Sequence, residues 1–215
     1  MESHIPTPLC VPSSSASPSS SASPSPARII LVRHGRSALV HRGGWLSSAG
    51  VQRQRDEYDA AGIAADDVPP LALMAEVGPT GIVVASDLPR ALESAERLAP
   101  GEPIPVSPLL RETPLEIPTR LPLRMPLAGW EALMHARWTL QIANGSDASP
   151  KDLTRAHAAA DWLVSMSRDH SPVVALTHGV FRRLLADRLM TMGWRGESGQ
   201  RSYDHWSAWS FERDS

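Results

Sequence analysis

The chain reads Arg28-Ile29-Ile30-Leu31-Val32-Arg33-His34-Gly35-Arg36-Ser37 near its start, and this stretch decides the predicted fold. Four consecutive apolar residues predict a fully buried strand, which ends abruptly in Arg33, His34 and Gly35. Open α/β sheets bind ligands at the carboxyl ends of their strands, so a guanidinium and an imidazole are expected where a ligand would bind. Gly35 allows the backbone to turn sharply or to lie close to that ligand.

A second stretch of the same kind lies far along the chain, at Pro172-Val173-Val174-Ala175-Leu176-Thr177-His178-Gly179. Its apolar run again predicts a buried strand that ends in His-Gly. One Arg-His-Gly alone is equally compatible with a strand that stops at a polar loop, but two such strands are hard to attribute to chance. A third buried strand is predicted over residues 81–86, and Asp87-Leu88-Pro89-Arg90-Ala91 follows it.

Together these motifs resemble the histidine phosphatase superfamily, which has the phosphoglycerate-mutase-like fold. The resemblance covers the chain from Ala27 to its C-terminus and rests on Arg33-His34-Gly35, Ser86 to Ala91 and Thr177-His178-Gly179. It implies an α/β fold, a three-layer α/β/α sandwich with a mostly parallel central sheet. The alternation of predicted strands and helices along the chain favours the same architecture.

Helices are predicted where capping residues or prolines precede suitable stretches, and they span residues 49–61, 68–77, 126–142, 150–166 and 180–192, with one more ending at residue 98. Short strands are predicted at 104–106 and 207–211. Between residues 111 and 129 a proline recurs every four residues, which forbids a continuous helix. This segment is expected to be an ordered irregular excursion, of the kind that often forms lids or binding loops.

Residues 1–27 are rich in Ser and Pro and contain no aromatic residue. Such a stretch cannot bury enough apolar surface to offset the entropy lost on ordering, and it lacks the basic start and apolar core of a secretory signal peptide. We therefore expect a disordered tail over residues 1–27 and a histidine phosphatase-like domain over residues 28–215.

Composition argues against several other classes of protein. The 215 residues carry a net charge of −2, so no global basic field indicates nucleic-acid binding. Cys10 is the only cysteine, which excludes an internal disulfide, and no apolar run is long enough to span a membrane. The histidines do not fall at metal-site spacings, so no metal or cofactor is expected. We expect a cytoplasmic protein that acts on a small phosphorylated metabolite; the sequence indicates no oligomeric state.

Four side chains are expected to meet at the carboxyl edge of the sheet: Arg33, His34, Arg90 and His178. Two guanidiniums can grip a phosphoryl group bidentately, and an imidazole can act as a covalent nucleophile. A second imidazole, if protonated, can donate to the oxygens of the transferring phosphoryl group. By resemblance, His34 is the nucleophile that becomes phosphohistidine, and the other three residues complete the phosphate pocket.

The resemblance also implies a general acid, which the family usually places after its third strand in a stretch reading leucine, arginine, glutamate. Leu110-Arg111-Glu112 matches this pattern, so Glu112 is the expected acid and Glu116 is the alternative. In the loop after the first strand, Ser37 keeps the family's small hydroxyl, and Ser37 and Arg36 are expected to contact the substrate.

The sequence departs from the family pattern at several positions. Arg36 replaces the Glu or Gln of many members, and Val40 stands where an Asn often assists the phosphate pocket. His41 could compensate for Val40, and Trp130 is a candidate wall of the pocket. The remaining histidines have no motif around them and are predicted to be structural or exposed: His4, His135, His157, His170 and His205.

The function predicted from these residues is a metal-independent phosphomonoester hydrolase. Three alternatives stay open: a phosphoglycerate-type mutase, a protein phosphohistidine phosphatase, and a non-catalytic phosphate-ligand-binding protein of the same fold. Arg36 and the unusual segment after Glu112 favour hydrolysis over a mutase reaction. Val40 favours a binding protein, whereas the two histidines and two arginines of the phosphate pocket favour an enzyme.

Overall fold

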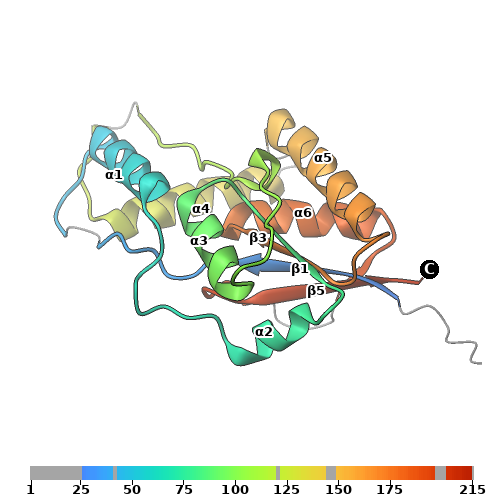
Figure 1. Ribbon diagram of the computed structural model, residues 1–215. Coiled ribbons are helices and arrows are strands. Elements are labelled where there is room, and N and C mark those ends of the chain that lie inside the picture. The colour runs from blue at the N-terminus through green and yellow to red at the C-terminus, as the bar shows by residue number, and fades with distance from the viewer. Residues whose placement is uncertain (1–25, 41–42, 120–121, 144–148, 197–201, 215) are drawn as a thin grey trace, which may run out of the picture.

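The computed structural model describes residues 26–40, 43–119, 122–143, 149–196 and 202–214 (Figure 1). The predicted tail lies outside the described residues up to residue 25, and so do Cys10 and His41. Among the described residues, no helix combines the length and the apolar character needed to cross a membrane.

A five-stranded sheet forms the centre of the molecule, in the order β2-β3-β1-β5-β4. Its strands are β1 (Ala27–Arg33), β2 (Ile82–Ala85), β3 (Val173–Thr177), β4 (Arg195–Gly196) and β5 (Ala208–Arg213). The first three strands pair in parallel, whereas β5 is antiparallel to both β1 and β4. The prediction of a mostly parallel sheet is therefore confirmed for the strands that carry the motifs and wrong for the C-terminal half of the sheet. Parallel neighbours need a crossover of a dozen or more residues, and the connection from β4 to β5 is shorter than that.

Six helices are present in the described residues: α1 (Ser48–Ala60), α2 (Leu71–Val77), α3 (Pro89–Leu98), α4 (Leu127–Ala143), α5 (Pro150–Met166) and α6 (Gly179–Thr191). One 3₁₀ turn, η1, spans Pro108–Leu110. These helices agree with the predicted ones within a few residues. The short strand predicted at 104–106 is reduced to a single bridge between Ala85 and Val106, because the flanking prolines cannot donate to a sheet ladder.

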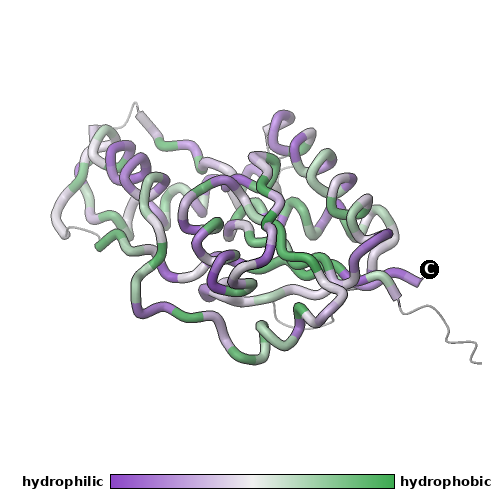
Figure 2. Tube along the Cα trace, viewed as in Figure 1, coloured by the Kyte–Doolittle hydropathy of each residue, from purple (hydrophilic) through white to green (hydrophobic). Residues whose placement is uncertain are grey.

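The three layers follow from the alternation of side chains along the buried strands. In β1, Ile29 and Leu31 pack against α5 and α6, whereas Ile30 and Val32 pack on the opposite face with α2 and α3. Figure 2 shows the hydrophobic strands at the centre and hydrophilic residues on the outer turns of the helices. The predicted three-layer α/β/α sandwich is confirmed.

A smaller hydrophobic cluster joins α1, α4 and the proline-rich segment that connects them to the sheet, and we call this lobe the cap (residues 46–60 and 113–143). Its buried members are Val51, Ile117, Trp130 and Met134. Figure 1 shows α1 and α4 together at one side of the sheet. Trp130 is fully buried there and its indole N–H donates to the Leu46 carbonyl at 2.9 Å, so it belongs to the core of the cap and does not line the pocket.

Candidate active site

The two His-Gly motifs meet because β1 and β3 are parallel neighbours. Arg33 lies opposite Thr177 in the pairing register, and the His34 amide donates to the Thr177 carbonyl at 3.0 Å. Both imidazoles therefore leave the sheet at the same edge, and their ring centroids lie 5.0 Å apart. The structure brings together this part of the predicted constellation.

The His34 ring is held in one tautomer. Its Nδ1 lies 2.7 Å from the Gly35 carbonyl and must carry a proton to donate there, while Arg90 Nε donates to the opposite nitrogen, Nε2, at 3.3 Å. Burial lowers the pKa of His34 well below its ordinary value; the Gly35 hydrogen bond opposes this, and the charges of Arg90 and Arg33 reinforce it. The imidazole is thus neutral at physiological pH, with a lone pair on Nε2.

Gly35 is required by packing against the protein itself. A Cβ at this position would lie 2.4 Å from the Asp67 carboxylate and 2.7 Å from the Trp206 ring. The sequence predicted close approach to a ligand, but the groups that occupy this space come from other parts of the chain.

His178 is fully buried beside His34. Its Nε2 lies 3.0 Å from the hydroxyl of Ser86, at the end of β2, and its Nδ1 has no hydrogen-bond partner among the described residues. Burial, followed by the charges of His34 and Arg90, lowers the pKa of His178 well below its usual range. The buried Nδ1 is a polar atom that an arriving ligand could satisfy.

Arg90, at the start of α3, is almost completely buried against the His34 ring. Its two terminal nitrogens donate to the Tyr58 carbonyl at 2.9 Å and to the Asp59 carboxylate at 3.1 Å. The guanidinium also stacks over the Tyr58 ring, 4.2 Å from its centroid. Two residues of α1 thus fix the orientation of Arg90, and sequence motifs gave no indication of either.

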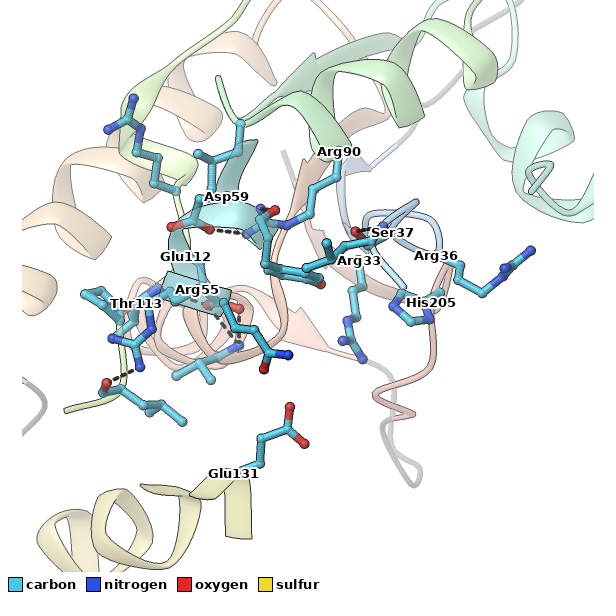
Figure 3. A pocket seen from close by; sticks show the side chains of 18 of the residues that line it. Arg33, Arg36, Ser37, Arg55, Asp59, Arg90, Glu112, Thr113, Glu131 and His205 are labelled. Carbon is cyan, nitrogen blue, oxygen red and sulfur yellow. Dashed lines mark hydrogen bonds and ion pairs between the residues drawn. The ribbon is translucent and has the colours of Figure 1, made fainter. Parts of the chain in front are cut away.

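Arg33 approaches the same place from the end of β1. It donates to the Tyr203 carbonyl and to the hydroxyl of Tyr58, while its Nε is buried without a partner in the described part of the chain. Burial raises the pKa of the Tyr58 hydroxyl, which keeps this phenol a donor at neutral pH. Arg33, Tyr58 and Arg90 thus lie near His34, and Figure 3 shows the two arginines among the residues that line the pocket.

Glu112 follows the 3₁₀ turn η1, and its side chain contacts the first turn of α6. Its Oε1 accepts hydrogen bonds from the amides of Thr113 at 2.9 Å, Val180 at 3.2 Å and Phe181 at 2.9 Å, whereas Oε2 has only a long contact of 3.4 Å to Val180. Glu116 points elsewhere: its side chain is 70% exposed, it pairs with Arg137 at 3.6 Å, and it does not line the pocket. Of the two candidate acids, the structure brings only Glu112 to the pocket.

The loop after His34 reaches the pocket, and both predicted residues, Arg36 and Ser37, line it. Ser37 lines the pocket, but its hydroxyl accepts a hydrogen bond from the Leu39 amide. Arg36 pairs with Asp66 at 2.8 Å, and Figure 3 shows its side chain directed away from Arg90. Val40 is 83% exposed at the pocket rim.

Sequence reasoning also missed a third imidazole. His205, expected to be structural or exposed, lines the pocket with its ring centroid 5.7 Å from that of His34. Burial and the neighbouring Arg33 lower the pKa of His205, although Asp67 opposes the change. The residue after it, Trp206, has a φ of 61°, an uncommon conformation that turns this loop toward the site. No local motif predicts such a turn.

The segment that carries Glu112 is fastened by Arg155 of α5. Arg155 donates to the carbonyls of Leu109 and Arg111 and to the Thr113 hydroxyl, and it pairs with Asp152 at 2.8 Å. Its guanidinium also stacks on Phe181 of α6, 4.0 Å from the ring centroid. Because these contacts converge on one cation, the Glu112 segment is held rigidly against α5 and α6.

A pocket of about 1120 Å³ opens between this cluster and the cap, and Figure 3 shows its polar lining. Its inner end is lined by Arg33, Arg90, Glu112 and His205. Among the described residues, no group of three or more His, Cys, Asp or Glu side chains is arranged to hold a metal ion. The inner end therefore presents two guanidiniums and one carboxyl group, and the His34 ring is buried directly behind Arg90 without lining the pocket itself.

Known proteins share both a family pattern and a fold with this chain. The family model of the histidine phosphatase superfamily (branch 1) matches residues 29–207. The fold is similar to that of a mycobacterial glucosyl-3-phosphoglycerate phosphatase, with 18% identity and a TM-score of 0.50 over 78% of this chain and 81% of the other. It is also similar to a phosphoserine phosphatase from Entamoeba histolytica bound to 3-phosphoglyceric acid, with 15% identity and a TM-score of 0.45 over 76% and 80% of the two chains. No protein with a curated description matches.

Proposed function

The chain belongs to the histidine phosphatase superfamily, and from this premise we propose a metal-independent phosphomonoester hydrolase that acts through a phosphohistidine at His34. The observation that carries the proposal is the state of that ring. Its Nδ1 is committed to the Gly35 carbonyl, so the nucleophilic lone pair is on Nε2, where it accepts a hydrogen bond of 3.3 Å from Arg90 Nε that the incoming phosphoryl group would displace. The proposed substrates are small phosphorylated metabolites of the cytoplasm.

In the first step, Nε2 of His34 attacks the phosphorus atom, and the bond from phosphorus to the ester oxygen breaks. The guanidiniums of Arg33 and Arg90 would bind the phosphoryl oxygens, where charge must be stabilised. His178 Nδ1 would donate to the same oxygens once the incoming dianion favours its protonated form. Glu112 would give its proton to the departing alkoxide from Oε2, the oxygen with the weaker contacts.

In the second step, water attacks the phosphohistidine and the phosphorus–nitrogen bond breaks. The Glu112 carboxylate takes a proton from the water, inorganic phosphate departs, and His34 regains its neutral ring. In this cycle Arg33, Arg90 and His178 would stabilise the negative charge of the phosphoryl group, and Glu112 would give and regain the proton. The proposal therefore includes no metal.

The decisive experiment traps the intermediate. Rapid quenching with labelled phosphate ester, without acid, should give acid-labile, base-stable label on wild type and none on His34→Ala. Turnover of p-nitrophenyl phosphate should persist in a chelator. Absence of both label and turnover would instead support a non-catalytic phosphate-binding protein, and label that persists in His34→Ala would refute the nucleophile.

A further inference from the structure

We propose that the outer part of this pocket selects phosphate monoesters whose alcohol portion is apolar, carries an amine and has no second acidic group. The inference rests on the proposed function and adds the substrate class. It comes from three features of the pocket wall: its apolar surface, the pairing of its cations and one carboxylate that stands without an ion pair.

Part of the pocket wall over the cap is apolar, beside the polar side chains of Gln54, Arg55 and His135. Val51 of α1, Leu115 of the proline-rich segment, and Leu127 and Met134 of α4 all line it. The pocket volume of about 1120 Å³ exceeds the roughly 300–1,000 Å³ of typical sites for drug-sized ligands, so a phosphate group fills only its inner end. Each methylene that a substrate buries against such a wall improves binding by up to about fourfold.

The arginines outside the phosphate end are already paired. Arg111 makes two hydrogen bonds of 2.6 Å to the Asp87 carboxylate, and Arg155 pairs with Asp152 at 2.8 Å. Arg55 donates to the Leu115 carbonyl at 2.6 Å, and the carboxylates of Asp59 and Asp56 interact favourably with its charge. A substrate carboxylate in the outer pocket would compete with the carboxylates that already surround these arginines. A second acidic group on the substrate is therefore not favoured.

Glu131 adds a negative charge to the same wall. It lies one turn from Leu127 on α4, lines the pocket, and makes no ion pair within the described residues. Figure 3 shows Glu131 reaching from α4 toward the pocket, apart from Arg90. A protonated amine at the far end of an apolar chain would meet this carboxylate while the phosphate binds at the inner end.

The test uses three phosphate esters with one hexyl chain that ends in an amine, a methyl group or a carboxylate. At about pH 7.5 and low salt, wild type should show the highest kcat/KM for the amine and the lowest for the carboxylate. Glu131→Lys should reverse the order of these two, each changing by roughly two- to fivefold, the range of exposed ion pairs. Glu57→Lys is the matched control, because Glu57 lies exposed on α1 and does not line the pocket.

The outcomes distinguish a failure of the proposed substrate class from a failure of the proposed hydrolase function. Turnover of p-nitrophenyl phosphate with a preference for the carboxylate ester would overturn this inference alone. The inference also fails if Glu57→Lys shifts the preference as much as Glu131→Lys, because the effect would then be one of net charge. Absence of turnover and of labelled His34 with every ester would overturn the proposed function and this inference with it.

Discussion

The Glu112 carboxylate has two tasks in this structure, since it accepts hydrogen bonds from the first amides of α6 and faces the pocket. Glu112→Gln keeps an acceptor for the Phe181 amide but has no proton to give to an alkoxide. We expect it to slow alkyl phosphate esters by about 10²–10⁴-fold, and p-nitrophenyl phosphate much less, because p-nitrophenolate leaves unprotonated. Steady-state kcat values with the two substrates measure the difference.

Glu116→Gln is the control for this prediction, because its side chain points away from the pocket and pairs with Arg137. It should change neither rate appreciably. Equal slowing of both substrates by Glu112→Gln would show that the residue only positions α6. A dependence on the leaving group in Glu116→Gln would transfer the role of general acid to that residue.

At the scale of elements, α5 determines where the Glu112 segment lies, through the contacts of Arg155 to Leu109, Arg111 and Thr113. Arg155→Met should lower kcat for alkyl phosphates by roughly 10–100-fold with little change in KM, because small misplacements of a catalytic group are costly. It should also destabilise the fold by about 1–3 kcal/mol, since it leaves Asp152 and carbonyls unpaired. Kinetics and urea unfolding measure both effects.

Lys151→Met serves as the matched control, because Lys151 is an exposed cation on the same helix and should affect neither measurement. Arg155→Lys should recover part of the stability but little of kcat, because an ammonium cannot donate in several fixed directions at once. A loss of stability with unchanged kcat would mean that Arg155 has no influence on Glu112.

At the scale of the whole molecule, two buried neutral histidines link stability to pH. The folded state lowers the pKa values of His34 and His178 below the roughly 6.5 of an unfolded chain, chiefly by burial. Below that pH the unfolded state binds more protons, so the stabilisation is complete above about pH 6.5 and is lost as the pH falls toward the folded-state pKa values. Each histidine should remove up to about 1.4 kcal/mol per pH unit.

Urea unfolding of wild type between about pH 7 and 5 should therefore show a falling free energy of unfolding. His178→Gln, which removes one of these groups, should give a shallower fall over the same interval. Identical slopes for both proteins would mean that His178 is not a buried neutral imidazole.

The sequence was sufficient to predict those parts of the molecule that follow from local residue patterns. Buried runs that end in His-Gly predicted β1 and β3, and a family resemblance predicted the approach of Arg90 and Glu112 to them. Residues that reach the site through the tertiary fold had no such signal: Tyr58 and Asp59 arrive on a polar helix, and His205 on an irregular loop. Trp130 was a candidate for the pocket because sequence alone does not distinguish an aromatic residue that lines a pocket from one that is buried in a core. In the structure it is buried in the core of the cap.

The parallel pairing of Arg33 with Thr177 also determines when activity can begin during synthesis. A ribosome that adds about 5–20 residues per second makes β3 on the order of ten seconds after β1, since roughly 140 residues separate them. During that interval the nascent chain has His34 without the neighbouring His178, so the proposed site is incomplete. On the proposed mechanism, newly made molecules should therefore begin turnover only after β3 has been synthesised and has paired with β1.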